Sequence, residues 1–125
     1  MISQKYRFHG HASLKYVLAN GTIARGKVLS IKFVDNTRRH YSRVAIIISK
    51  KVLKHAVDRN RARRRLYEIM RQRLLQFNRV IDVAVMIYQP RVLDMSYDEL
   101  CLEVDKCLNK LGLIDSQDTI SSDKI

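Results

Sequence analysis

The hydrophobic and polar residues of this chain follow two periods, one typical of helices and one typical of strands. Three segments carry apolar residues at three- and four-residue spacing and are predicted to be helices: residues 11–20, 58–77 and 96–111. Three others alternate or form short unbroken apolar runs and are predicted to be strands: residues 25–34, 43–49 and 80–88. The predicted order is therefore helix, strand, strand, helix, strand, helix.

Turn and capping residues mark the ends of these elements. Asp58 is the predicted N-cap of the central helix, and Asn78 is its predicted stop. Ser96 and Glu99 have the spacing of a capping box, and Gly112 is placed to end the last helix. The polar segment 35–42 predicts a turn that joins the first two strands into an antiparallel hairpin.

This order predicts an α+β fold, a single-domain sandwich of three helices on a small mixed sheet. The domain is expected to span residues 1–113, with residues 1–8 as a basic, loose arm. Residues 114–125 form a polar tail that we expect to be disordered.

The net charge of the chain narrows the range of functions that it can have. The chain has a formal net charge of +12, and residues 1–81 carry 20 Lys or Arg against 3 Asp or Glu. The central helix alone has six arginines in residues 59–71, with only Asp58 and Glu68 to oppose them. A field of this size and sign favours an anionic partner, and nucleic acid fits it best.

Several catalytic and cofactor sites are not indicated. The sequence has neither a GxxxxGK[ST] nor a GxGxxG motif, and its acidic residues are too scattered to predict a two-metal nuclease site. No histidine has a Cys, Asp or Glu at ligand spacing, and Cys101 and Cys107 are expected to be reduced residues of the core or its boundary. With no apolar run long enough to cross a bilayer, we expect no membrane association and a cytoplasmic location.

One combination of motifs is more specific than the charge. Ser49-Lys50-Lys51 is followed by a short basic loop and then by Arg59-Asn60-Arg61-Ala62-Arg63-Arg64. This pattern resembles the signature of the bacterial ribonuclease P protein subunit. The resemblance implies a protein that joins a catalytic RNA and helps it remove the 5′ leader of precursor tRNA. It also implies a left-handed strand–helix–strand crossover, a 1:1 complex with the RNA subunit, and Mg²⁺ held mainly by that RNA.

The resemblance also implies roles for particular residues. Contacts with the RNA subunit are expected from the arginine motif and its neighbours: Arg59, Asn60, Arg61, Arg63, Arg64, Arg65 and Lys50. Contacts with the single-stranded leader are expected from Leu14, Leu18, Ser49, Lys51 and Tyr67. The chain departs from the family pattern in having Leu14 and Leu18 where two phenylalanines are common, and Tyr67 where an arginine is often found. No catalytic residue is expected in the protein.

Two other functions are compatible with parts of the sequence. A generic RNA-binding protein of the ribosomal-protein type would explain the charge, and only the ordered motifs argue against it. A protein-only nuclease would need acidic metal ligands beside the basic face, and the three acidic residues of residues 1–81 show no obvious convergence.

Overall fold

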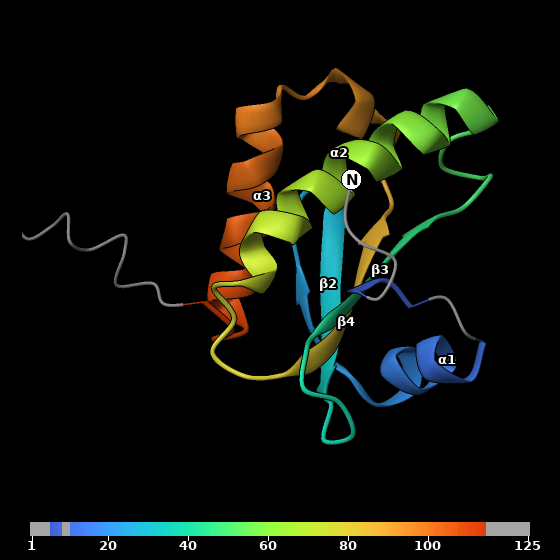
Figure 1. Cartoon of the computed structure of the whole chain (residues 1–125). Helices are drawn as coiled ribbons and strands as arrows, with labels where there is room; N and C mark the ends of the chain where they lie inside the picture. Colours follow the sequence, from blue (N-terminus) through green and yellow to red (C-terminus); the bar gives the residue numbers. More distant parts are fainter. Residues whose placement is uncertain (1–5, 9–10, 115–125) are drawn as a thin grey trace, which may run out of the picture.

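The computed structural model describes residues 6–8 and 11–114, which form three helices, one short 3-10 helix and four strands (Figure 1). The helices are α1 (His11–Asn20), α2 (Ala56–Leu74), η2 (Pro90–Asp94) and α3 (Tyr97–Lys110). The strands are β1 (Thr22–Arg25), β2 (Leu29–Asp35), β3 (Arg43–Ile48) and β4 (Ile81–Ile87). The predicted α+β class and the order of the helices are confirmed.

The four strands form one mixed sheet in the order β1-β2-β4-β3. β2 pairs antiparallel with both β1 and β4, whereas β3 pairs parallel with β4. The predicted hairpin between the segments 25–34 and 43–49 is therefore wrong, because β4 lies between β2 and β3. β4 is the most continuously apolar strand, so it takes a central position with both faces covered. The parallel unit β3–α2–β4 is present, and the hand of its crossover stays a prediction.

The predicted strand at residues 25–34 is in fact the end of one strand, a turn and a second strand. Gly26 donates its backbone N–H to the carbonyl of Leu29 at 2.7 Å, which closes the β1–β2 turn. A Cβ atom on Gly26 would lie 2.3 Å from Oε2 of Glu103, so the close approach of α3 requires glycine there. The sequence analysis extended the alternating segment that begins at Val28 back to Arg25, and so it missed this turn.

Helices cover both faces of the sheet. α2 and α3 pack over one face, where β2 and β3 direct their first apolar set, including Ile31, Val44 and Ile46, into the main core. α1 packs against β2 and β4 on the other face, over a smaller cluster of Phe8, Val17, Ala45 and Ala84. On this face Ala45 of β3 is buried in the smaller cluster and Ile47 packs against it, so β3 contributes to both core faces.

The observed ends of α3 match those predicted from the sequence, whereas the observed ends of α2 differ from the predicted ones. Ser96 and Glu99 form the predicted capping box, and Gly112 has the left-handed φ of 70° expected after a helix. The N-cap of α2 is His55, in an extended conformation, so Asp58 lies within the first turn and is not the cap. α2 ends at Leu74, three residues earlier than predicted, because the chain turns at Leu75.

The ends of the domain are also better defined. Residues 6–8 are not a loose arm, since Arg7 forms a bridge with Val44 and Phe8 is only 3% exposed. Leu113 and Ile114 are buried, so the core extends through residue 114. The predicted disorder of residues 115–125 lies outside the described residues. No helix in the described part of the chain is long and apolar enough to cross a membrane.

Candidate nucleic-acid interface

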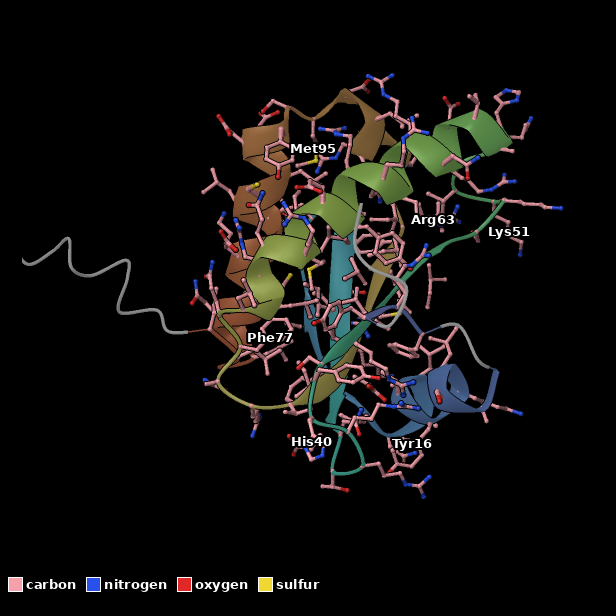
Figure 2. The ribbon with its side chains drawn as sticks, viewed as in Figure 1. Tyr16, His40, Lys51, Arg63, Phe77 and Met95 are labelled. Atoms are coloured by element: carbon pink, nitrogen blue, oxygen red, sulfur yellow. The ribbon has the colours of Figure 1, made fainter. Side chains whose placement is uncertain are left out.

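The basic motif begins in a turn that directly follows β3. The carbonyl of Ser49 accepts hydrogen bonds from the backbone N–H of Val52 at 3.1 Å and of Leu53 at 3.2 Å. Ser49, Lys50 and Lys51 are all exposed on this turn. Figure 2 shows Lys51 at the edge of the molecule, beside the first turns of α2. The turn therefore presents two ammonium groups next to the arginine helix.

The arginines of α2 point in different directions because the helix advances 100° per residue. Ala62, Leu66, Ile69 and Met70 form the buried stripe that the sequence predicted. The side chains opposite this stripe are exposed: Asn60, Arg61 and Arg64. Arg63 lies at the flank, half-buried, and donates through Nη1 to Oδ1 of Asn60 at 3.1 Å. This exposed side is the arginine face of α2.

Two of the predicted RNA-binding arginines are used inside the protein. Arg59 donates through Nη1 to the carbonyls of Leu53, at 2.9 Å, and Lys54, at 3.0 Å, and so holds the loop before α2. Arg65 donates to the carbonyls of Val92, at 3.3 Å, and Met95, and so holds η2 against α2. Both residues therefore have a structural function that the sequence did not predict.

The tyrosine expected to contact the leader is not available for stacking. The side chain of Tyr67 is only 6% exposed, and the guanidinium of Arg7 lies 5.7 Å from the centre of its ring. Burial raises the pKa of its phenol, which also hydrogen-bonds the backbone of Ile46. The burial of its ring does not favour stacking on the leader, and the leader contact of Tyr67 stays a prediction.

The other expected leader residues lie on the α1 side of the sheet. Leu14 packs against the smaller core cluster, while Leu18 keeps 36% of its surface exposed. Side chains alternate along a strand, so Ser49, two residues after Ile47, continues the side of β3 that faces α1. Leu18 and Ser49 are thus placed on the same side of the sheet, at its α1 layer and at the end of β3.

A buried ion pair beside α1 was not predicted. Nε of Arg43 lies 3.0 Å from Oδ1 of Asp82 and Nη2 lies 2.7 Å from Oδ2, in a bidentate pair. Asn36 donates to the same carboxylate, and the hydrogen bond to Asp82 raises the pKa of the Arg43 guanidinium. The only sequence signal was the single acidic residue in the apolar segment 80–88. The pair fixes the start of β3 to the start of β4.

The comparisons with known proteins decide the family. A family model described as Ribonuclease P matches residues 2–112. The chain belongs to the ribonuclease P protein family. It is 36% identical over 87 residues to the ribonuclease P protein component of Pseudanabaena sp., covering 70% of this chain and 75% of that protein. It is 39% identical over 97 residues to the protein component of Thermus brockianus, covering 78% of this chain but only 55% of that longer protein.

Solved structures of ribonuclease P proteins share the fold. The Staphylococcus aureus protein superposes with a TM-score of 0.78 at 19% identity, covering 88% of this chain and 98% of that one. The Thermotoga maritima protein superposes with a TM-score of 0.73 at 18% identity, covering 83% of this chain and 96% of that one. These two likenesses show that the chain shares the fold of these proteins.

The described residues of this ribonuclease P protein contain no group of three His, Cys, Asp or Glu side chains arranged to hold a metal ion. Cys101 is half-buried and Cys107 is buried, and both are free thiols. Burial raises the pKa of each thiol, which favours the neutral form. The side chains that the Ser49–Lys51 turn and α2 expose are mainly those of lysine and arginine, which bind anions.

Proposed function

We propose that this chain binds the RNA subunit of ribonuclease P through the arginine face of α2 and the Ser49–Lys51 turn. The observation that carries the proposal is the exposure of four cations, Lys50, Lys51, Arg61 and Arg64, on adjoining elements. None of the four takes part in an ion pair within the described part of the chain. Unpaired cations bind phosphates and release counterions, which gives strong, salt-dependent affinity.

Arg59, Arg63 and Arg65 support this surface in a different way. Arg59 fixes the loop that carries the lysines, and Arg63 holds the amide of Asn60 in place. Arg65 anchors η2 behind the helix. In this proposal Asn60, Arg61, Arg63, Arg64 and Lys50 contact RNA, whereas the main function of Arg59 and Arg65 is to hold the surface in shape.

The second part of the proposal concerns the substrate. We propose that the 5′ leader of precursor tRNA passes Leu14, Leu18, Ser49 and Lys51. Lys51 supplies attraction for phosphates, and the exposed part of Leu18 supplies apolar contact that tolerates any base. The RNA subunit holds the Mg²⁺ and cleaves the phosphodiester bond, in a 1:1 complex in the cytoplasm.

The arginine face is tested by the salt dependence of binding. The change of log K for the RNA subunit with log salt concentration is measured for wild type, Arg61→Ala and Arg64→Ala. Each variant is expected to reduce the slope by about 1, with little change in stability. Arg25→Ala is the matched control, because Arg25 is exposed on β1, at the opposite edge of the sheet from β3. Equal slopes in all four proteins would exclude the arginine face as the contact.

Activity and bound RNA test the broader assignment. The protein freed of RNA is expected to be inactive on precursor tRNA, and activity is expected only with the RNA subunit and Mg²⁺. RNA that copurifies with the protein is expected to contain one abundant structured RNA and precursor tRNA. Cleavage by the RNA-free protein, or copurification of ribosomal RNA alone, would refute the assignment.

A further inference from the structure

A hollow lies at the end of α2 that is farthest from the arginine motif. It has a volume of about 740 Å³ and is bordered by the end of α2, the segment that leads into β3 and the segment that leads into β4. In Figure 2, His40 and Phe77 mark its region, well separated from Lys51 and Arg63. Its lining residues are Tyr6, His40, Tyr41, Ser42, Arg71, Leu74, Leu75, Phe77, Asn78, Arg79 and Val80.

The lining combines aromatic rings with positive charge. Tyr6 and Tyr41 stand edge to face, with ring centres 5.5 Å apart, and Phe77 adds a third ring. Arg71 and Arg79 supply two guanidinium groups, and no acidic side chain is among the described residues that line the hollow. Rings beside cations are the combination with which proteins hold unpaired bases and the phosphates next to them.

Both guanidinium groups have exposed ion-pair partners that phosphate can replace at little cost, although Arg79 also lies 5.1 Å from the centre of the Phe33 ring. Arg79 lies 3.5 Å from the carboxylate of Asp35, and the two side chains are 48% and 60% exposed. Arg71 pairs with Glu68 one turn away on α2, with side chains 48% and 36% exposed. Exposed pairs of this kind contribute at most about 1 kcal/mol, and two adjacent phosphates of an RNA strand can compete with them.

An apolar rim completes the hollow. Leu75 is 90% exposed at the point where α2 ends, and its side chain borders the opening. A large aliphatic side chain in water is unfavourable, and it becomes favourable when a flat apolar group such as a base covers it. A peptide partner is less well matched, because the cations lie beside rings whose faces suit stacking.

We propose that this hollow is a second RNA contact, in which an unpaired base stacks against its aromatic lining while Arg71 and Arg79 hold the neighbouring phosphates. The inference rests on the proposed function, and it extends the RNA contact from the arginine face to the other end of α2. Arg61 and Arg71 are ten residues apart, which is about 15 Å along the helix. The protein then binds RNA at two places along one helix, α2.

Two pairs of variants test the hollow. Tyr41→Leu removes a ring and Tyr41→Phe keeps it, whereas Leu75→Glu and Leu102→Glu add the same charge at an exposed leucine of α2's end and of α3. Affinity is measured for the RNA subunit and, separately, for a single-stranded oligoadenylate of about eight nucleotides. Tyr41→Leu and Leu75→Glu are expected to lower both affinities about fivefold or more relative to their controls. Thermal unfolding checks that each variant is folded.

Ultraviolet crosslinking locates the base directly. Irradiation of the complex with the RNA subunit, followed by mass spectrometry, is expected to yield adducts on peptides containing Tyr41 or Phe77. Equal affinities within both pairs of variants would overturn the proposal, and so would a Leu75→Glu protein that changes its oligomeric state without losing RNA affinity.

The two probes separate this proposal from the proposed function. A wild-type protein that ignores the RNA subunit but binds the oligonucleotide through Tyr41 would refute the ribonuclease P assignment and support the hollow. If the wild type and Tyr41→Leu bind the RNA subunit equally well, the ribonuclease P assignment would be supported and the proposed role of the hollow would be refuted.

Discussion

The carboxylate of Glu103 on α3 accepts a hydrogen bond from the backbone N–H of Val28, at 3.0 Å, in the turn between β1 and β2. The same oxygen accepts from the N–H of Lys27, and Glu103 is only 7% exposed. A charged side chain is rarely this buried unless hydrogen bonds satisfy it. The contact therefore joins the last helix to the first hairpin across 75 residues of sequence.

Replacement of Glu103 is predicted to destabilise the fold. Glu103→Ala leaves two backbone N–H groups without their acceptor and should lower the free energy of unfolding by about 1–3 kcal/mol. Glu103→Gln keeps one acceptor oxygen and should lose less. Asp98→Ala, at an exposed acidic residue of the same helix, is the control. Denaturant unfolding measures all three, and equal stabilities for Glu103→Ala and Asp98→Ala would contradict the role of this contact.

Two adjacent arginines of α2 are predicted to have opposite functions. Arg65→Ala removes the hydrogen bonds to the carbonyls of Val92 and Met95 and should cost about 1–3 kcal/mol of stability. Arg64→Ala, at an exposed position, should change stability by no more than about 0.5 kcal/mol. Their effects on the salt slope of RNA binding should be reversed, with the larger effect at Arg64. If Arg65→Ala and Arg64→Ala changed stability and the salt slope by the same amounts, burial would not separate the structural arginine from the RNA-binding one.

The arginine helix shows how far sequence reasoning extends. Its position, buried stripe and motif were predicted because helical periodicity and the Ser49–Lys51 and Arg59–Arg64 motifs are local features. The structural roles of Arg59 and Arg65 were not predicted. Arg59 depends on how the loop before α2 folds back to place the carbonyls of Leu53 and Lys54, and Arg65 depends on carbonyls remote in sequence. Met95, for example, is 30 residues from Arg65 and reaches it only through the path of β4 and η2.

The sheet shows the same limit. The strands β2, β3 and β4 were recognised near their observed places, but β1 was not predicted as a separate strand. Strand pairing depends on the whole chain, and the polar segment 35–42 gave no sign that β4 would come between β2 and β3. The burial of Tyr67 likewise depends on Arg7 and β3, which are remote in sequence. The capping box of Ser96 and Glu99 was predicted correctly because both partners lie within one turn, whereas the Asp58 cap was not.

The two cysteines are predicted to react slowly and in a fixed order. Burial raises the pKa of both thiols above the ordinary 9.0, so each has a smaller thiolate fraction near neutral pH than a free cysteine. Iodoacetamide should modify half-buried Cys101 first, faster as the pH rises, and Cys107 only when the protein opens. Mass spectrometry of the native protein against the denatured protein tests this order.

The same shift has a consequence for stability at high pH. A thiol pKa that is raised in the folded state contributes stability that is fully present below the unfolded pKa, and this stability is lost as the pH rises through the folded pKa. The free energy of unfolding should therefore fall above about pH 9. The fall should be smaller in Cys107→Ala, once its lower stability at neutral pH is allowed for.

The last prediction concerns the leader. Within the assembled enzyme, the ratio of precursor tRNA affinity to mature tRNA affinity isolates the leader, since the two RNAs differ only by it. Lys51→Ala should lower this ratio by removing a phosphate contact, and Leu18→Phe should raise it, because stacking on a base contributes about 1–3 kcal/mol. Leu18 is the better site for the added ring than Leu14, because Leu14 already packs against the smaller core cluster and a larger side chain there would strain it.

A matched control uses the exposed tyrosine of the same helix. Tyr16 is 60% exposed and lies two residues before Leu18, so Tyr16→Leu removes a ring from a different side of α1. If the leader follows Leu18, the affinity ratio should respond to Leu18→Phe and not to Tyr16→Leu, and it should depend on leader length more than on leader sequence. A ratio that falls in Tyr16→Leu and stays constant in Leu18→Phe and Lys51→Ala would place the leader on the other side of α1, beside the segment 36–39.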